Sequence, residues 1–220
     1  MGDRQSGVET VCSEVSAMAS RFVTRRRTAL RRDGRRLLVA ASGVIVRAEA
    51  AWEHVDLGPG CRFYGVARFE RVGRSSIEIG ADCVFRSARW SNPVGIDRPC
   101  RISAIGSGAR VAIGDDSGFS GVVICAAEEI VIGDRVLCGC NVTIVDADWH
   151  GLDPARRSDG VGATAPVRIE NDAFLGMGVV VLKGVTIGRG SVVGAGSVVT
   201  RSIPPMSVAA GNPARVVGQL

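Results

Sequence analysis

Aliphatic side chains recur at every sixth position in the last third of the chain. From Ile169 onward the series is Ile169, Leu175, Val181, Ile187, Val193 and Val199. Four positions after each of the first five stands a small or short aliphatic residue: Ala173, Val179, Val185, Ser191 and Ser197. The same register recurs upstream at Ile113, Phe119 and Cys125 and at Ile132, Cys138 and Ile144, and it becomes irregular towards Ile79 and Ile102.

A period of six matches neither the period of about 3.6 of a helix nor the simple alternation of a hairpin strand. It fits a short strand followed by a turn, with an aliphatic side chain pointing inward and a small one four residues later. Three such faces make a triangular coil of 18 residues, the spacing between Ile169 and Ile187. Stacked coils pair their strands in parallel and bury each other's inner layer. The pattern therefore predicts an all-β solenoid.

A different pattern, with helical spacing, occupies the N-terminus. Its apolar positions are Val8, Val11, Cys12, Val15, Met18, Ala19, Phe22 and Val23. Residues 1–36 hold nine arginines against four acidic residues, a net charge of +5, and the remaining residues are neutral overall. We expect a helical, basic arm over residues 1–50 and an irregular lead-in coil over 51–76. The arm either caps the solenoid or, through residues 1–36, touches a membrane peripherally.

Composition excludes several classes of protein. The basic charge is confined to the arm and only ten residues are aromatic, which argues against a nucleic-acid partner. Seven cysteines without a CxxC pair, and only two histidines, predict no metal site and a reduced compartment. The longest apolar run, 37–46, is about half of the ~18 residues that span a bilayer. We expect a cytoplasmic protein, with the membrane contact of the arm as the alternative.

The C-terminal motifs resemble those of a known family. They are Ile187-Gly188, the run Gly194 to Thr200, Ile203-Pro204-Pro205 and the run Ala210 to Val217. These segments resemble the coenzyme end of hexapeptide-repeat acyltransferases, above all sugar and polysaccharide O-acetyltransferases. The resemblance implies a left-handed parallel β-helix over 77–203 and a coenzyme-binding tail over 204–220. It also implies acetyl-CoA as cosubstrate, no metal, direct transfer in a ternary complex, and a homotrimer with its site between two subunits.

The period breaks once, between Ile144 and Ile169, where 25 residues replace a coil of 18. We expect a loop at about 146–166 to leave the stack, and loops of this kind carry function. It holds Asp146, Asp148 and His150, which resemble the D-x-D-x-H loop that supplies the family's catalytic histidine. Imidazole is neutral near pH 7 and can hold a hydroxyl proton, so His150 is the expected general base. His54, the other histidine, is expected to be structural.

Roles for the neighbouring residues follow from the same chemistry. Asp146 and Asp148 share a strand face with His150, so either could orient its imidazole or hold an acceptor hydroxyl. Trp149 and Arg157 are further candidates for acceptor contact. The resemblance implies a coenzyme groove with phosphate contacts at two arginines. Its expected residues are Gly176, Met177, Gly178, Gly194, Ala195, Arg201, Asn212, Pro213 and Arg215. Within this set, the backbone N–H of Gly176 is the expected oxyanion donor.

Other functions on the same coil are less compatible with the residues. A γ-class carbonic anhydrase needs three zinc-binding histidines, and this chain has two. A sugar nucleotidyltransferase needs a nucleotide-binding domain, for which residues 1–76 are too short. A catalytically silent scaffold would not require a histidine in its one large break. The acceptor stays open among a sugar, a glycan and a small metabolite, and N-acetyl transfer to an amino sugar is the alternative to O-acetyl transfer.

Overall fold

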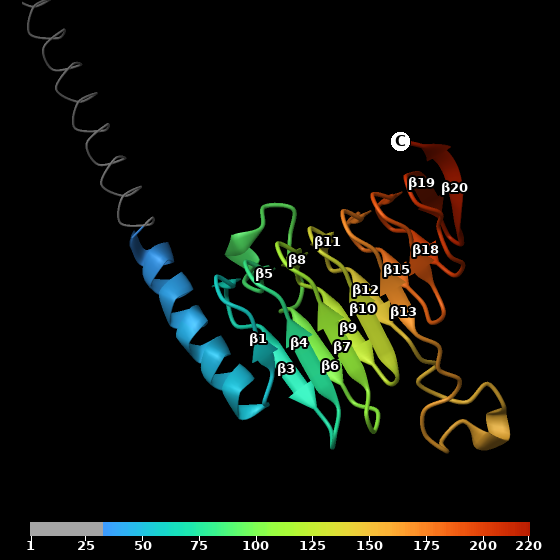
Figure 1. The fold of residues 1–220 in the computed structure, drawn as a ribbon, viewed down its shortest axis with the longest axis horizontal. Helices are drawn as coiled ribbons and strands as arrows, with labels where there is room; N and C mark the ends of the chain where they lie inside the picture. The colour runs from blue at the N-terminus through green and yellow to red at the C-terminus, as the bar shows by residue number, and fades with distance from the viewer. Residues whose placement is uncertain (1–32) are drawn as a thin grey trace, which may run out of the picture. The chain divides into compact units, whose positions relative to one another are not determined.

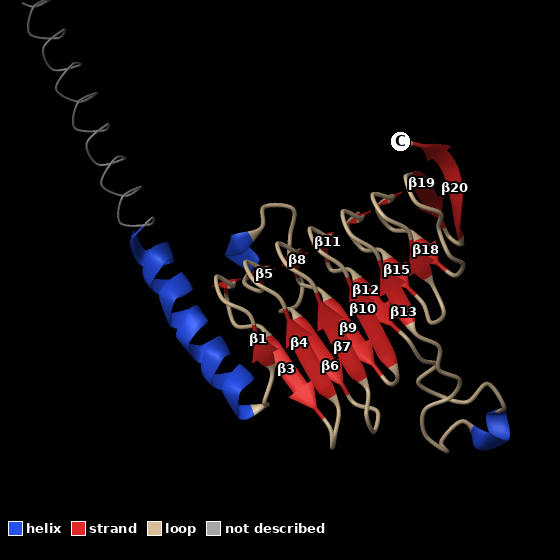
Figure 2. Cartoon of the chain, in the orientation of Figure 1, coloured by secondary structure: helices blue, strands red, loops and turns tan. Residues whose placement is uncertain are grey.

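The computed structural model describes residues 33–220, except the side chain of Arg156. The chain divides into two units, residues 1–40 and 41–220, and the strands described for residues 33–220 lie in the second. The predicted helical stripe from Val8 to Val23 falls outside the described residues. Residues 33–52 are helical, in agreement with the expected helical arm (Figure 2). Over 33–220, no helix combines the length and the hydropathy needed to cross a membrane.

Residues 56–220 form three sheets, labelled here A, B and C, that the chain visits in turn (Figure 1). Sheet A contains β1 (Asp56–Leu57), β4 (Ser76–Ile79), β7 (Arg110–Ile113), β10 (Glu129–Ile132), β13 (Val167–Ile169) and β16 (Thr186–Ile187). Sheet B contains β2 (Arg62–Tyr64), β5 (Val84–Arg86), β8 (Gly118–Ser120), β11 (Leu137–Cys140), β14 (Phe174–Leu175), β17 (Val192–Val193), β19 (Ser207–Gly211) and β20 (Ala214–Gln219). Sheet C contains β3 (Arg68–Arg71), β6 (Arg101–Ala104), β9 (Val123–Ala126), β12 (Thr143–Val145), β15 (Val180–Val181) and β18 (Val198–Val199).

Neighbouring strands in all three sheets run parallel, apart from the antiparallel pair β19–β20 at the C-terminus. The predicted period sets the register: Ile169 pairs with Ile187, Leu175 with Val193, and Val181 with Val199. All six side chains are buried. Each coil therefore covers the inner aliphatic layer of the next, as the hexad predicted, and backbone polar groups are satisfied from coil to coil.

The solenoid begins earlier than the repeat suggested. Strands β1, β2 and β3 lie within residues 51–76, which were expected to be irregular, and they pair in parallel with the next coil. Aromatic residues fill the inner position here: Phe63, Phe85 and Phe119 stack with ring centroids 5.3 and 5.2 Å apart. The period is hidden because residues 87–100, with the short helix η1 (Arg89–Ser91), are inserted between β5 and β6.

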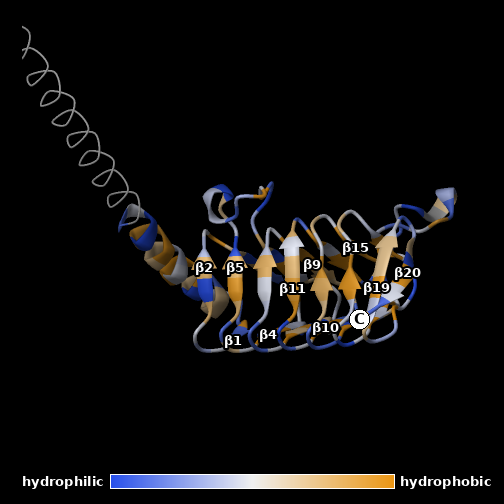
Figure 3. Ribbon diagram, turned by 90° about the horizontal axis from the view of Figure 1, so that it is seen from above, coloured by the Kyte–Doolittle hydropathy of each residue, from blue (hydrophilic) through white to orange (hydrophobic). Residues whose placement is uncertain are grey.

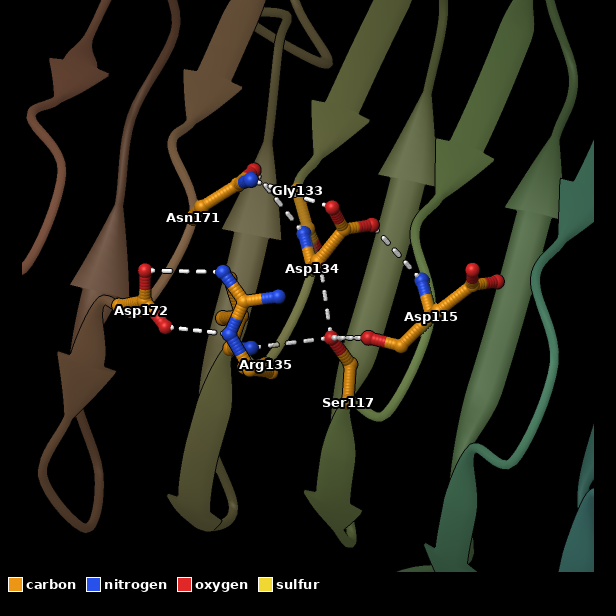
Figure 4. Close-up of polar contacts among 8 residues, drawn as sticks. Asp115, Ser117, Gly133, Asp134, Arg135, Asn171 and Asp172 are labelled. Atoms are coloured by element: carbon orange, nitrogen blue, oxygen red, sulfur yellow. Dashed lines mark hydrogen bonds and ion pairs between the residues drawn. The ribbon is translucent and has the colours of Figure 1, made fainter.

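The corner between sheets A and B is held by side chains that bind the backbone of the neighbouring coil (Figure 4). The N–H of Asp115 donates to Asp134 Oδ1 at 3.0 Å, and the N–H of Asp134 donates to Asn171 Oδ1 at 3.1 Å. Arg135 adds a two-pronged ion pair with Asp172, at 2.6 and 3.0 Å, which lowers the pKa of that carboxyl. These contacts link coils whose residues lie 19 and 37 positions apart.

The second half of the helix packs against the first coil. Val46 and Ala50 belong to the hydrophobic core. Arg47 donates to the carbonyl of Cys61 at 2.8 Å, and Glu49 pairs with Arg68 at 2.9 Å. Residues 42–50 thus cover the open end of the coil stack, whereas the choice between cap and membrane contact was made for the stripe from Val8 to Val23, which lies outside the described residues.

Candidate active site

The predicted loop leaves the stack between β12 and β13, where Figure 1 shows it as a projecting excursion that includes the short helix η2 (Pro154–Arg156). Its two ends are joined like a short antiparallel ladder. Ala147 bridges Thr164, and the N–H of Asp148 donates to the carbonyl of Ala163 at 2.9 Å. The loop therefore starts from a fixed base on the corner between sheets C and A.

His150 lies just beyond this base and is exposed to solvent. Its Nδ1 is 3.2 Å from the carbonyl oxygen of Arg157, across the loop. A carbonyl only accepts hydrogen bonds, so Nδ1 carries the proton of this contact, and in the neutral imidazole the lone pair is then on Nε2. The arrangement holds the imidazole in the tautomer that a general base needs.

Neither aspartate orients this imidazole among the described contacts. Asp148 binds Lys183 instead, with Nζ 2.7 Å from Oδ1. Asp146 is fully buried, and its carboxylate accepts the N–H of Ala127 at 2.7 Å and of Glu128 at 2.8 Å. In this conformation Asp146 caps the turn at Ala127 and Glu128, and its role in orienting the base or holding the acceptor stays a prediction. A carboxylate can cap a backbone turn as readily as it can serve a substrate, and sequence spacing does not separate the two.

The other acceptor candidates lie within the same loop. Trp149 is half-buried and Arg157 is exposed. A hollow of about 330 Å³ lies next to them, and sequence reasoning did not identify it. It is lined by Gly151, Leu152, Asp153, Asp159, Gly160, Val161 and Gly162. Its glycines and solvent-facing polar residues carry no periodic signal from which it could have been predicted.

The expected coenzyme residues form a column at a different corner, between sheets B and C. Gly176, Met177 and Gly178 follow β14, and Gly194 and Ala195 follow β17 one coil later. The coils approach closely here, because a Cβ added to Gly176 would lie 2.6 Å from the backbone nitrogen of Ala195. The turn accepts only a glycine at this position without a shift of the backbone.

The backbone donors of this column differ from the expectation. The N–H of Gly176 donates to the carbonyl of Val193 at 2.8 Å, so it is occupied within the stack. The N–H of Met177 has no hydrogen-bond partner among the described residues, and the same holds for Ala195. Gly176 as oxyanion donor stays a prediction, and in this conformation its N–H is used between coils.

The tail adds polar groups to the same corner. Asn212 and Pro213 connect β19 to β20, and Ala210, two positions before Asn212, lies beside Gly194. Arg215 is exposed next to this turn. Arg201, by contrast, follows β18 and lies on the corner between sheets C and A, the corner that carries Lys183 and the His150 loop. The structure thus separates Arg201 from the other expected coenzyme residues of the same protomer.

Comparisons with known proteins identify the family. Residues 166–201 match the bacterial transferase hexapeptide family (six repeats). Nodulation protein L of Rhizobium leguminosarum is 42% identical over 129 residues, which cover 53% of this chain and 67% of that protein. Galactoside O-acetyltransferase of Escherichia coli is 44% identical over 91 residues, 41% of this chain and 44% of that protein.

A solved structure supports the same assignment. The crystal structure of a hexapeptide-repeat-containing acetyltransferase of Vibrio cholerae is 26% identical, with a TM-score of 0.51, covering 84% of this chain and 92% of that chain. The chain spans 44% and 61% of the length of two of its other curated relatives, so the match is to part of each protein. The predicted left-handed parallel β-helix with an N-terminal helix is confirmed, and the chain belongs to the hexapeptide-repeat transferase family.

Proposed function

We propose that the protein is an acetyl-CoA-dependent O-acetyltransferase that acts on a hydroxyl of a sugar or glycan, with His150 as general base. The contact between His150 Nδ1 and the carbonyl of Arg157 carries this proposal, because in the neutral imidazole it places the proton on Nδ1 and leaves Nε2, on the projecting loop, as the acceptor. The name of the E. coli relative, a galactoside O-acetyltransferase, supports a sugar acceptor. A base of this kind accelerates such a transfer by about 10²- to 10⁴-fold.

The chain's own groups would act in order. His150 Nε2 accepts the proton of the acceptor hydroxyl while that oxygen attacks the thioester carbonyl. The N–H of Met177, rather than that of Gly176, is the donor that can stabilise the oxyanion, since it has no partner among the described residues. The imidazolium then returns its proton to the departing sulfur. No side chain has to form an acyl-enzyme intermediate.

A trimer would bring the two halves of the site together. Within one protomer, sheet C separates the His150 loop from the Met177 column, because they lie on its opposite corners. In a trimer whose three protomers face a common axis with sheet C, the B–C corner of each protomer lies next to the C–A corner of the adjacent protomer. The outer face of sheet C is suited to such packing, with Val123, Val180 and Val198 in register with Thr143. We therefore infer a homotrimer with one site per interface.

In the proposed trimer, Arg215 and Arg201 of two adjacent protomers would lie at the same groove. Arg215 lies beside the proposed groove, and in the trimer the Arg201 of the adjacent protomer would face it. Both side chains are exposed, and a guanidinium offers a fixed fork of donors to a phosphate. They are the residues that we assign to the phosphates of coenzyme A.

The test follows thiol release from acetyl-CoA with a panel of mono- and oligosaccharides. His150→Ala should trimerise like the wild type and lose at least 100-fold in kcat, while the control His54→Ala should keep its activity. Mild alkali should release acetate from the product, since an O-acetyl ester hydrolyses under conditions that leave an amide intact. Near wild-type turnover in His150→Ala would exclude His150 as the base, and an alkali-stable product would identify N-acetyl transfer.

A further inference from the structure

The helix that caps the coil stack has a second apolar face. Its inner face contains Ser42, Gly43, Val46 and Ala50, which are buried. On the opposite side lies a stripe that we call the outer stripe: Ala41, Val44, Ile45, Ala48 and Trp52. These positions follow the i, i+3, i+4, i+7, i+11 spacing of one helix face. The inner face accounts for the cap, so the outer stripe has a separate cause.

The large side chains of the outer stripe are well exposed. Val44 is 71% exposed, Ile45 50% and Trp52 82%. In the preceding unit, Leu37 and Leu38 are 72% and 53% exposed, and each stands seven residues before a member of the stripe. Single exposed apolar residues are ordinary, whereas a contiguous apolar face marks an interaction surface. Figure 3 shows hydrophobic residues, in orange, along this helix.

The charge of the segment before the outer stripe indicates what the stripe binds. Residues 1–36, directly before the stripe, carry nine arginines and a net charge of +5, while the rest of the chain is neutral. A basic segment joined to an amphipathic helix that ends in Trp is the composition that binds the surface of an anionic bilayer. Pairing of two outer stripes from two copies would instead bring two segments of +5 together, which repel each other. The charge therefore favours lipid over a second copy of the chain.

We propose that the outer stripe and the basic residues before it bind the surface of an anionic lipid bilayer, with the helix lying in the interfacial plane. The apolar side chains enter the boundary between headgroups and acyl chains, and the arginines contact lipid phosphates. In this arrangement the first coil is the part of the solenoid nearest to the membrane. This attachment is independent of the acyl transfer proposed above, so either can fail without the other.

The experiment is cosedimentation of the full-length protein with large vesicles. One set contains phosphatidylglycerol and phosphatidylcholine, and the other contains phosphatidylcholine alone. The variant Val44→Gln/Ile45→Gln/Trp52→Gln keeps helix propensity and removes the stripe. The control Val72→Gln/Val94→Gln/Val217→Gln removes three exposed valines outside the helix. We expect at least tenfold stronger partition onto anionic vesicles, a loss of at least tenfold in the stripe variant, and no loss in the control.

Fluorescence supplies a second measurement on a chain with the stripe intact. In the variant Trp90→Phe/Trp149→Phe, the emission of Trp52 should shift to the blue on addition of anionic vesicles and stay unchanged with phosphatidylcholine. Equal partition onto both vesicle types would overturn the charge argument. A stripe variant that binds as well as the wild type would overturn the stripe. The third outcome is that the wild type does not bind vesicles and the stripe variant forms a smaller oligomer than the wild type. That result would overturn the proposal and assign the outer stripe to contacts between copies of the chain.

Discussion

The ammonium group of Lys183 lies 2.7 Å from a carboxylate oxygen of Asp148 and ties the base of the His150 loop to the next coil. Lys183 is the only lysine of the chain. Both side chains are about one-third exposed, 32% and 28%, so the pair is worth about 1 kcal/mol. Its importance is geometric: it fixes the strand end from which His150 projects.

Lys183→Met should loosen the loop without unfolding the solenoid. We expect kcat to fall three- to tenfold, KM for acetyl-CoA to stay within twofold, and the free energy of unfolding to fall by about 1 kcal/mol. Asp148→Asn should behave alike, and the double variant should be little worse than either one, because both remove the same contact. Arg189→Met, on the A–B corner, is the control and should leave kcat unchanged. Additive losses in kcat would show that the two residues act separately.

Asp146 should matter for stability. In Asp146→Asn one amide nitrogen would face a backbone N–H of Ala127 or Glu128, so a buried hydrogen bond is lost and two donors meet. We expect the free energy of unfolding to fall by about 1 to 3 kcal/mol in urea titration. Asp148→Asn, at a side chain that is 28% exposed, serves as the comparison and should cost less. Full stability with lost turnover in Asp146→Asn would restore Asp146 to the chemistry.

Two glycines of the B–C corner should respond differently to an added methyl group. Gly176→Ala places Cβ 2.6 Å from the nitrogen of Ala195, so the coils must move apart, at a cost of about 3 kcal/mol. Gly178→Ala meets open space and is strained only by its φ of +68°, at about 1 kcal/mol. Thermal unfolding of both variants measures the difference. Equal costs would show that the stack can relax at Gly176.

The pH dependence of alkylation should distinguish Cys61 from the other cysteines of residues 33–220. All three of Cys61, Cys100 and Cys138 are buried, but the neighbouring Cys83 thiol and the charge of Arg47 lower the pKa of the Cys61 thiol to about 7, whereas burial raises the pKa of the Cys100 and Cys138 thiols. Alkylation of Cys61, followed by mass spectrometry, should rise through pH 7 and then level off, because the thiolate fraction saturates above the pKa. Cys83→Ala should move this midpoint to higher pH, and Cys138→Ala should not. An unchanged midpoint in Cys83→Ala would contradict the assigned cause.

Much of the fold could be predicted because the hexad is a local signal. An inward aliphatic residue at Ile169, Leu175 or Val181 is needed on every face, whatever the neighbouring coil contains. The break before Ile169 is visible for the same reason, and with it His150. The first coils were missed because Phe63 and Phe85 replace the aliphatic residue and the insertion at 87–100 hides the spacing.

The sequence by itself determined the period, the all-β architecture, the loop and the histidine that projects from it. Only the tertiary structure decided which groups meet across coils. Asp146 binds a turn 19 residues away, and Lys183 reaches Asp148 over 35 residues. Within residues 33–220, the N–H of Met177 has no hydrogen-bond partner while that of Gly176 is used between coils. A periodic sequence specifies which side chains point inward. It does not specify which outward groups pair, since that depends on how the turns of adjacent coils are aligned.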